Sequence, residues 1–204
     1  MYIPPAFAEQ RLDVLHEFMT VHPFIMLVTR GTGGLVASHV PVILQRSRGE
    51  RGTIQLHLAK PNPQCDDLAA GIDALVVFHG PHAYISPTWY AMKAVVPTWN
   101  YVAVHAYGTP HVMDDDALHQ HLNDLVATYE KGWTTEAALS ADGFAKLRRA
   151  IVGFEIPIAR LEGKWKLGQN RAREDRLGAI AGLRATGRTD DATIANWMAG
   201  TIEA

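Results

Sequence analysis

The spacing of short apolar runs is the feature that most constrains what this chain can fold into. The runs are rich in β-branched and aromatic residues, and turn-forming or polar segments separate them. Because few helical patterns lie between them, such runs predict strands joined by hairpins, in an antiparallel barrel and not in a sheet of βαβ units. The expected strands are Phe24–Thr29, Leu35–Leu44, Ile54–Leu58, Ala74–Phe78, Tyr101–Tyr107 and Ile151–Leu161.

Helical periodicity is confined to a few segments outside these strands. Apolar residues recur at helical spacing from Leu12 to Met19. They recur again from Leu118 to Tyr129, after Asp114–Asp116, whose charges favour a helix N-terminus. Residues 144–150 are a further short helical pattern. The sequence therefore predicts a mainly β fold with peripheral helices.

The last part of the chain has a different pattern. Arg173–Ala185 and Asp190–Met198 predict two helices that are too short to bury a core of their own. A DNA-binding helix would present several polar side chains to base edges, whereas the second of these helices offers only Asn196. We therefore expect a barrel domain over residues 1–171 and a helical hairpin over 172–204, packed on the barrel or on a dimer partner.

Composition narrows the classes of function. Of the 204 residues, 48% are hydrophobic and 20% are charged, which is ordinary for a globular protein with a real core. The net charge of -2 gives no basic footprint for nucleic acid. Cys65 is the single cysteine, so no internal disulfide and no multi-cysteine metal site can form. No signal peptide or membrane-spanning stretch is visible, and we expect a soluble, cytoplasmic protein.

Three segments concentrate aromatic side chains, hydroxyls and amides among prolines. They are His57–Pro63, His79–Tyr90 and Pro97–Tyr101. Since proline removes a backbone donor and fixes φ, we expect these segments to be rigid loops at strand ends and not parts of a ladder. Rigid loops of this composition suit a flat aromatic ligand with polar edges.

Two polar stretches could contact such a ligand, and each has an ordinary structural alternative. Lys60–Gln64 offers one cation, two amides and backbone N–H groups that could hold a phosphate, but it could equally be a strand-to-helix turn with solvated side chains. Ser38–Pro41 interrupts an apolar strand. It could be an edge that hydrogen-bonds a ligand ring, or a bulge around a core histidine.

Other chemistries find little support. The chain has ten histidines, but none shows the ligand spacing of a zinc site, so we expect no metal centre. Haem is not specified by any pattern. A hydrolase is not supported, because there is no Gly-x-Ser-x-Gly elbow, no paired carboxylate and no recognisable partner for Cys65. We assign no catalytic residue. Lys164–Arg171 gathers cations and amides, and is either a ligand contact or a solvated connector.

These three proline-rich segments, together with the start of the chain and the stretch Lys166–Arg171, resemble a known family. Gly80–Pro87 with Trp89-Tyr90, followed by Pro97–Tyr101, is similar to the signature of the PaiB-type FMN-binding negative transcriptional regulators. The resemblance covers nearly the whole chain. One departure is Gly168, where the family pattern suggests a serine before Gln169.

The resemblance implies an FMN-binding split β-barrel, related to pyridoxamine-phosphate oxidases and flavin reductases, that works as a homodimer with flavin at the subunit interface. Carried over by position, it implies a cofactor site in four groups. These are Ser38, His39, Val40 and Pro41 along the isoalloxazine; His57, Leu58, Ala59, Lys60 and Asn62 along the ribityl chain and phosphate; Tyr84 and Ser86 near the ring or the dimer seam; and Trp99, Asn100, Gln169, Asn170 and Arg171, which reach in from the partner.

Three functions follow as hypotheses. The first is an FMN-binding homodimer that acts as a negative transcriptional regulator, with the flavin as a redox or ligand sensor. The second is an FMN-dependent oxidoreductase of the flavin-reductase or pyridoxamine-oxidase type, and the third is a haem-binding split barrel. Direct DNA binding is not supported by charge, and would need a local basic patch such as Arg171, Arg173 and Arg176.

Overall fold

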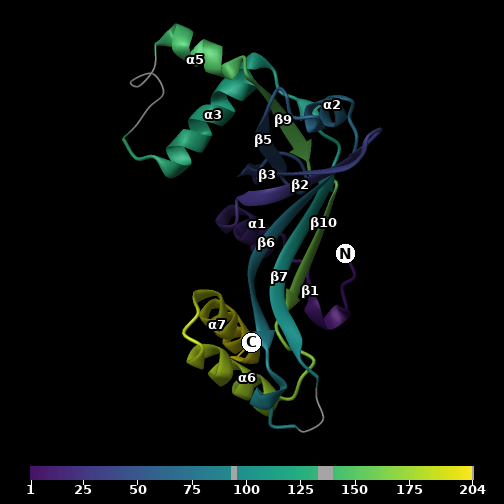
Figure 1. The fold of residues 1–204 in the computed structure, drawn as a ribbon, viewed down its shortest axis with the longest axis vertical. Coiled ribbons are helices and arrows are strands. Elements are labelled where there is room, and N and C mark those ends of the chain that lie inside the picture. Colours follow the sequence, from purple (N-terminus) through teal and green to yellow (C-terminus); the bar gives the residue numbers. More distant parts are fainter. Residues whose placement is uncertain (93–95, 133–139, 204) are drawn as a thin grey trace. The chain divides into compact units, whose positions relative to one another are not determined.

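The computed structural model describes residues 1–92, 96–132 and 140–203. The chain forms two compact units (Figure 1). The first unit holds residues 1–15, 79–104 and 162–204, and the second holds residues 16–78 and 105–161. Strands β6 (Ala74–Ile85) and β7 (Thr98–Gly108) contribute residues to both units.

The second unit contains two groups of strands. In one, β2 (Phe24–Gly31) pairs antiparallel with β3 (Gly34–Pro41) and, through Met26–Val28, with the start of β6. The other is a four-stranded sheet of order β4-β5-β9-β8. Its strands are β4 (Ile43–Gln45), β5 (Thr53–Ala59), β9 (Ile151–Pro157) and β8 (His111–Val112), and the helices of this unit are α2 (Gln64–Ala69), α3 (Asp115–Tyr129), α5 (Ala141–Arg148) and the later part of α1 (Leu12–Val21).

The core of the second unit is made of the inward residues of these strands. Alternation along β2 and β6 turns every second side chain inward. β5 is buried along most of its length, because both of its neighbours in the sheet are paired to it. The fully buried side chains include Leu27, Ile54, Leu56, Phe78 and Phe154.

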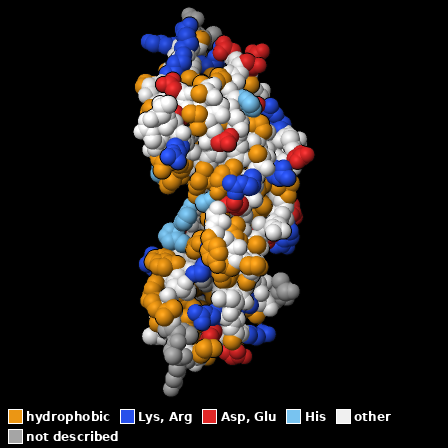
Figure 2. Space-filling view, turned by 90° about the vertical axis from the view of Figure 1, so that its right-hand side faces the viewer, with side chains coloured by type: hydrophobic (Ala, Val, Ile, Leu, Met, Phe, Trp, Pro, Cys, Tyr) orange, Lys and Arg blue, Asp and Glu red, His pale blue; other side chains and the backbone are white. Residues whose placement is uncertain are grey.

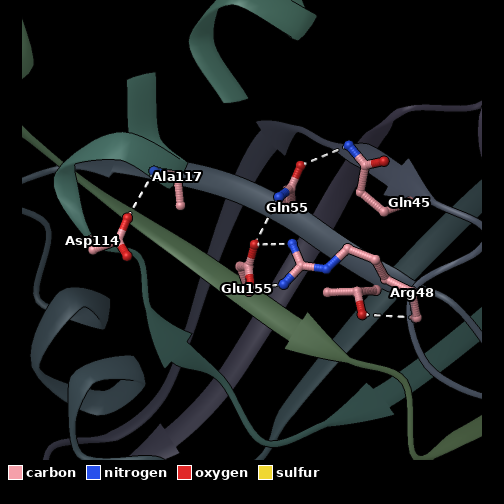
Figure 3. A network of polar contacts seen from close by, with 7 residues as sticks. Gln45, Arg48, Gln55, Asp114, Ala117 and Glu155 are labelled. Atoms are coloured by element: carbon pink, nitrogen blue, oxygen red, sulfur yellow. Dashed lines mark hydrogen bonds and ion pairs between the residues drawn. The ribbon is translucent and has the colours of Figure 1, made fainter. Parts of the chain in front are cut away.

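A polar network holds the four-stranded sheet together on its other face (Figure 3). The carboxylate of Glu155 on β9 accepts from Nη2 of Arg48 at 2.7 Å and from Nε2 of Gln55 at 2.8 Å. Gln55 in turn accepts from Nε2 of Gln45 at 2.9 Å. Burial raises the pKa of Glu155, but the hydrogen bonds from Arg48 and Gln55 outweigh it, and the net pKa is lowered. Three successive strands are thereby tied through one carboxylate.

The first unit is built on strands in the order β1-β10-β7-β6. β1 (Ala8–Glu9) pairs antiparallel with β10 (Arg160–Lys166), Ala8 lying opposite Lys164. Two short 3-10 turns, η1 (Pro5–Phe7) and η2 (Pro87–Trp89), and the helices α6 (Arg173–Ala185) and α7 (Thr189–Glu203) complete it. The buried side chains of this unit include Leu167, Ile180, Leu183, Ile194 and Met198.

Most of the expected elements are confirmed, but two expected strands are each divided: Leu35–Leu44 forms β3 and β4, and Ile151–Leu161 forms β9 and the start of β10. The proline-rich segments are loops only in part, because residues 60–63 form a turn whereas two other stretches belong to strands. Residues 79–85 continue β6, and residues 98–101 belong to β7. The burial of β6 alternates up to Gly80 and resumes, shifted by one residue, at Ala83. An extra residue at Pro81 accounts for this shift, because a bulge accommodates a residue that has no N–H to donate. Pro81 therefore does not end this strand.

The helical hairpin predicted at the end of the chain is present, and its second helix runs on to Glu203. No helix in the described ranges is long and apolar enough to span a membrane.

α6 packs closely against η2 through two glycines on one face. A Cβ at Gly182 would lie 2.2 Å from the indole of Trp89, and a Cβ at Gly178 would lie 2.0 Å from the Trp89 carbonyl oxygen. The helix can approach the indole this closely only because both positions lack a side chain.

This contact predicts opposite effects for the same substitution at two helical glycines. Gly182→Ala should destabilise the protein by about 2 kcal/mol, because the added methyl overlaps the Trp89 ring. Gly200→Ala in α7, where a Cβ meets nothing within 4 Å, should instead stabilise by up to about 1 kcal/mol through helix propensity. Urea unfolding of the two variants measures both effects. Equal effects at the two sites would contradict the packing described.

Candidate functional site

The turn after β5 presents the one lysine of the expected phosphate contact. The backbone N–H of Lys60 donates to the carbonyl of Ala150 at 2.9 Å, and that of Asn62 donates to the carbonyl of Ala59 at 2.9 Å. The Lys60 side chain is exposed, and in the described ranges it has no carboxylate partner. A fixed backbone with an unpaired ammonium group is suited to an anionic ligand.

Asn62 connects this turn to the edge strand. Its Nδ2 donates to the hydroxyl of Ser38 on β3 at 2.9 Å, while its Oδ1 accepts from the backbone N–H of Gln64 at 3.0 Å. The structure therefore brings together Ser38 and Asn62, two of the residues that the resemblance assigns to the flavin. Asn62 lies on the same turn as Lys60, and its hydrogen bond brings the Ser38 hydroxyl of β3 to that turn.

Gln64, one of the two amides that the sequence offers for a phosphate, is instead buried and holds the start of α2 to the neighbouring strands. Its side chain is 0% exposed, and Nε2 donates to the carbonyls of Leu27 at 3.3 Å and Val36 at 3.1 Å and to the hydroxyl of Thr29 at 3.2 Å. These bonds attach the start of α2 to both β2 and β3. A glutamine among apolar strands gives no sequence signal of this role, because its partners are mostly backbone carbonyls.

Ser38–Pro41 lies on an edge strand, as one of the two interpretations required. β3 is the last strand of its sheet, and its pairing with β2 is continuous from Gly31↔Gly34 to Phe24↔Pro41. The alternative of a bulge around a core histidine is therefore wrong: His39 is exposed, and its ring stacks on Phe24 with centroids 6.2 Å apart. Val40 and Pro41 are half-buried beside it.

The side chain of His57 faces another histidine. Its Nδ1 lies 3.1 Å from Nε2 of His121 on α3, and His121 is fully buried. Burial lowers the pKa of His57, and burial together with the neighbouring His57 lowers the pKa of His121 to about 4. Both rings are thus neutral at pH 7. Leu58 points into the core and Ala59 is exposed, so these two could contact a ribityl chain mainly through their backbone.

The first unit carries a strip of exposed rings on β6 and β7, which we call the aromatic strip: His79, His82, Tyr84 and Trp99. The centroid distances are 5.0 Å between His79 and His82, 5.9 Å between His82 and Trp99, and 5.9 Å between Tyr84 and Trp99. Tyr84 is 44% exposed and Trp99 is 52% exposed. Figure 2 shows histidine and hydrophobic side chains exposed together on one face of the molecule. Burial and the nearby His82 lower the pKa of His79, so its imidazole is neutral.

The remaining predicted contacts are engaged within the first unit. Asn100 is buried and its Nδ2 donates to the sulfur of Met198 at 3.3 Å. Gln169 accepts from the N–H of Leu167 and donates to the carbonyl of Trp165. Ser86 accepts from the N–H of Thr88 at the start of η2. Ser86 and Gln169 thus hold nearby backbone, and Asn100 holds the Met198 side chain of α7.

Arg171 and Asn170, unlike Ser86 and Gln169, make no side-chain hydrogen bond to nearby backbone within the described residues. The guanidinium of Arg171 lies over the ring of Tyr90, 5.2 Å from its centroid, while Asn170 is exposed. Gly168 has φ +80, a left-handed conformation that serine would adopt only with strain. The departure from the family pattern at this position therefore has a local backbone reason.

The residues present in the second unit fit FMN. A phosphate needs a cation and hydrogen-bond donors, which Lys60 and Asn62 offer on the turn and Ser38 offers on the adjoining strand β3. An isoalloxazine needs a surface with free polar groups for its edge, which the edge strand Ser38–Pro41 of the same unit offers. Among the residues that the structure describes, no group of three or more His, Cys, Asp or Glu could hold a metal ion.

Two antiparallel sheets with peripheral helices define the fold class, a split barrel. The chain belongs to the family described as "Putative FMN-binding domain", whose model matches residues 1–160. The expected family, fold class and cofactor, FMN, are thereby confirmed.

Relatives and solved structures agree with this assignment. The chain is 35% identical to "Protease synthase and sporulation protein PAI 2" of Bacillus subtilis, over 90% of this chain and 89% of that protein. It is 30% identical to "Uncharacterized protein AN0679" of Emericella nidulans, over 96% and 95%. Its fold is similar to that of the FAD and heme binding protein from Mycobacterium smegmatis, with a TM-score of 0.62, 18% identity, and coverage of 84% and 79%. The flavocytochrome Anf3 from Azotobacter vinelandii is similar with a TM-score of 0.59, 14% identity, and coverage of 78% and 69%.

Asn62→Asp tests the anion-suited turn without removing its cap. The new carboxylate can still accept from the N–H of Gln64, so the melting temperature should stay the same. It loses the donor to Ser38 and repels a phosphate, so FMN affinity should fall about tenfold to a hundredfold. Ser47→Asp, on an exposed loop of the same unit, adds the same charge and should leave FMN affinity unchanged. Isothermal titration measures both, and equal affinity for all three proteins would remove the turn from the site.

The buried histidine pair predicts a specific pH dependence of stability. The pKa of His121 is lowered from 6.5 to about 4, so the unfolded chain binds its proton more readily than the folded one. The free energy of unfolding should therefore fall as the pH is lowered from about 6.5 to about 4. His121→Gln should remove up to about 3 kcal/mol of this dependence. His111→Gln, at an exposed position, should leave it intact, and identical pH profiles for both variants would contradict the assignment.

Proposed function

We propose that the protein is an FMN-binding homodimer that serves as a flavin-based sensor in negative regulation of transcription. FMN, when bound, supplies reversible transfer of one or two electrons, and the protein supplies its binding and exposure. The observation that carries the proposal is the anion-suited turn after β5, joined to the edge strand β3 through Asn62 and Ser38, in a chain of this family. The similarity to a Bacillus subtilis protein named for protease synthesis and sporulation supports the regulatory part.

The phosphate end of the site rests on the turn after β5. Lys60 would hold the dianion as a point charge, while Ser38 and the amide of Asn62 would direct it. Neither role requires the turn to move, because the backbone at Lys60 and Asn62 is already hydrogen-bonded. The carried-over edge Ser38–Pro41 would then run along the ring system, with its unpaired backbone groups available for the polar edge of the isoalloxazine.

The dimer is supported by the aromatic strip. Trp99 and Tyr84 each expose close to half of their surface next to two exposed imidazoles, on strands that otherwise alternate between inside and outside. Clusters of large exposed rings mark interaction surfaces, because covering them removes apolar area from water. A second copy of the chain, with its own flavin, is the occupant that the family resemblance implies for this surface.

A regulatory role that acts through the flavin or through another protein is favoured over direct DNA binding. Each chain has a net charge of -2, so a dimer of two such chains would carry twice that negative charge. Of the three arginines considered for a basic patch, Arg171 lies over Tyr90 and Arg176 donates to Thr201 and Met198. Arg173 is the member that stays exposed.

The visible spectrum and the turnover of the purified protein distinguish the functions considered. A sensor should show flavin absorption bands, and it should oxidise NADH or NADPH no faster than free FMN under the same conditions. Turnover well above that background would contradict the sensor and favour the oxidoreductase. A Soret band after addition of haem, with no binding of FMN, would favour the haem-binding alternative instead.

Trp99→Glu tests the dimer surface. A charge in the middle of the aromatic strip cannot be buried without a partner, so the solution mass should fall from twice that of one chain to that of a single chain, and FMN affinity should fall at least about tenfold with it. Tyr129→Glu, at an exposed ring of α3, is the matched control and should change neither. Analytical ultracentrifugation of both variants decides the point. A Trp99→Glu protein that stays dimeric would place the dimer contact elsewhere.

A further inference from the structure

A pocket lies in the first unit, apart from the residues proposed to hold the phosphate of FMN. It has a volume of about 350 Å³ and is formed by β1, the start of α1, the end of β10 and the helix α7. A volume of this size holds one ring or two fused rings with a small substituent. Its lining is Ala8, Glu9, Arg11, Val14, Trp165, Leu167, Gln169, Asn196, Trp197, Gly200 and Thr201.

The walls offer flat apolar surface. The side chains of Trp165 and Trp197 come from β10 and α7, and Val14 and Leu167 add aliphatic surface. Aromatic rings prefer such surroundings, since offset or edge-to-face contacts with indole add to the gain from burial. The apolar part of the pocket therefore favours an aromatic ligand.

The charged part of the pocket is an arginine held in place by its own glutamate. Oε1 of Glu9 accepts from Nε of Arg11 at 3.0 Å and Oε2 accepts from Nη2 at 2.7 Å. Oε1 also accepts from the backbone N–H groups of Gln10 and Arg11, each at 2.9 Å. The hydrogen bond from Arg11 is the main reason why the pKa of Glu9 is lowered. This carboxylate is only 12% exposed and is already satisfied by these donors, so it offers little to a cationic ligand.

The guanidinium of Arg11 is in the opposite situation. It is 72% exposed, and among the described residues its Nη1 has no hydrogen-bond partner. A second arginine stands behind Thr201 in the pocket wall: Nη2 of Arg176 donates to the Thr201 hydroxyl and, at 3.4 Å, to the carbonyl of Met198. Within the described ranges Arg176 has no carboxylate partner, and its buried Nε has no hydrogen bond. Glu9 is satisfied within the protein, and Asp13 also lies near enough for its charge to act on Arg11, but Nη1 of Arg11 is left as an exposed charged donor at the pocket, which favours an anionic group.

We propose that this pocket binds a small aromatic carboxylate, with the ring against Trp165 and Trp197 and the carboxylate on Arg11. The pocket depends on α7, which lies beyond residues 1–160 matched by the family model. Gln169 lines it as a wall only, because its amide is used on the backbone of Leu167 and Trp165. The site is therefore a second binding site, whose occupant need not be related to flavin.

The test compares indole-3-acetate with the neutral indole-3-acetamide, by isothermal titration into the FMN-loaded full chain. The acid should bind about tenfold more tightly than the amide, because only the acid forms a charge-assisted bond to the guanidinium. Arg11→Gln should lower the affinity for the acid to that for the amide and leave the amide unchanged. Arg46→Gln, an exposed arginine of the second unit, should alter neither affinity.

Gly200→Leu is the variant that fills the pocket without disturbing the fold. A Cβ at Gly200 meets nothing within 4 Å, and leucine favours a helix more than glycine does, so the protein should stay folded and should melt no lower than the parent. Both probes should lose measurable binding to it. Three outcomes would overturn the proposal: equal affinity of the parent protein for acid and amide, unchanged binding to Gly200→Leu, or release of FMN as the acid binds, which would make the pocket part of the flavin site.

Discussion

The hydrogen bonds of one buried side chain, that of Gln64, determine how the proposed cofactor turn is presented. Its amide nitrogen reaches backbone carbonyls on both β2 and β3 and the hydroxyl of Thr29, so the start of α2 cannot shift along either strand without breaking a buried bond. Two residues earlier, Asn62 ties the same turn to Ser38. The turn that carries Lys60 is therefore rigid before any ligand arrives, which lowers the entropy that binding would cost.

The second constraint is the shape of the long strands β6 and β7. A change of one residue in the alternation of β6, at Pro81, brings His79, His82 and Tyr84 to the exposed side of the first unit, where Trp99 of β7 meets them. On α6, Gly178 and Gly182 let the helix approach Trp89, which follows the same strand in the chain. The exposed rings of the aromatic strip and the packed ring of Trp89 thus come from neighbouring parts of the sequence. The strip lies on strands, whereas Trp89 lies in the 3-10 turn η2 against α6.

Much of this could be predicted from the sequence, and the failures have physical causes. Strand positions, the α3 start at Asp114 and the helical tail follow from hydrophobic period and capping residues. The segments around Pro81 and Trp99 were wrongly expected to be loops, because a bulge tolerates a proline that a regular ladder would reject. The anchoring role of Gln64, the burial of His121 and the pocket under α7 gave no signal, since each depends on contacts between distant parts of the chain. The residues expected to contact flavin were carried over from the family by position, and the structure brings Ser38 and Asn62 together among them.

FMN and riboflavin differ only in the phosphate, so comparing their affinities tests whether the turn after β5 recognises that group. We predict that the protein binds FMN about a hundredfold more tightly than riboflavin, and that Lys60→Ala narrows this ratio to about tenfold or less while riboflavin affinity stays the same. Equal affinity for the two flavins would contradict it, because the fixed turn and its lysine would then have no anion to hold.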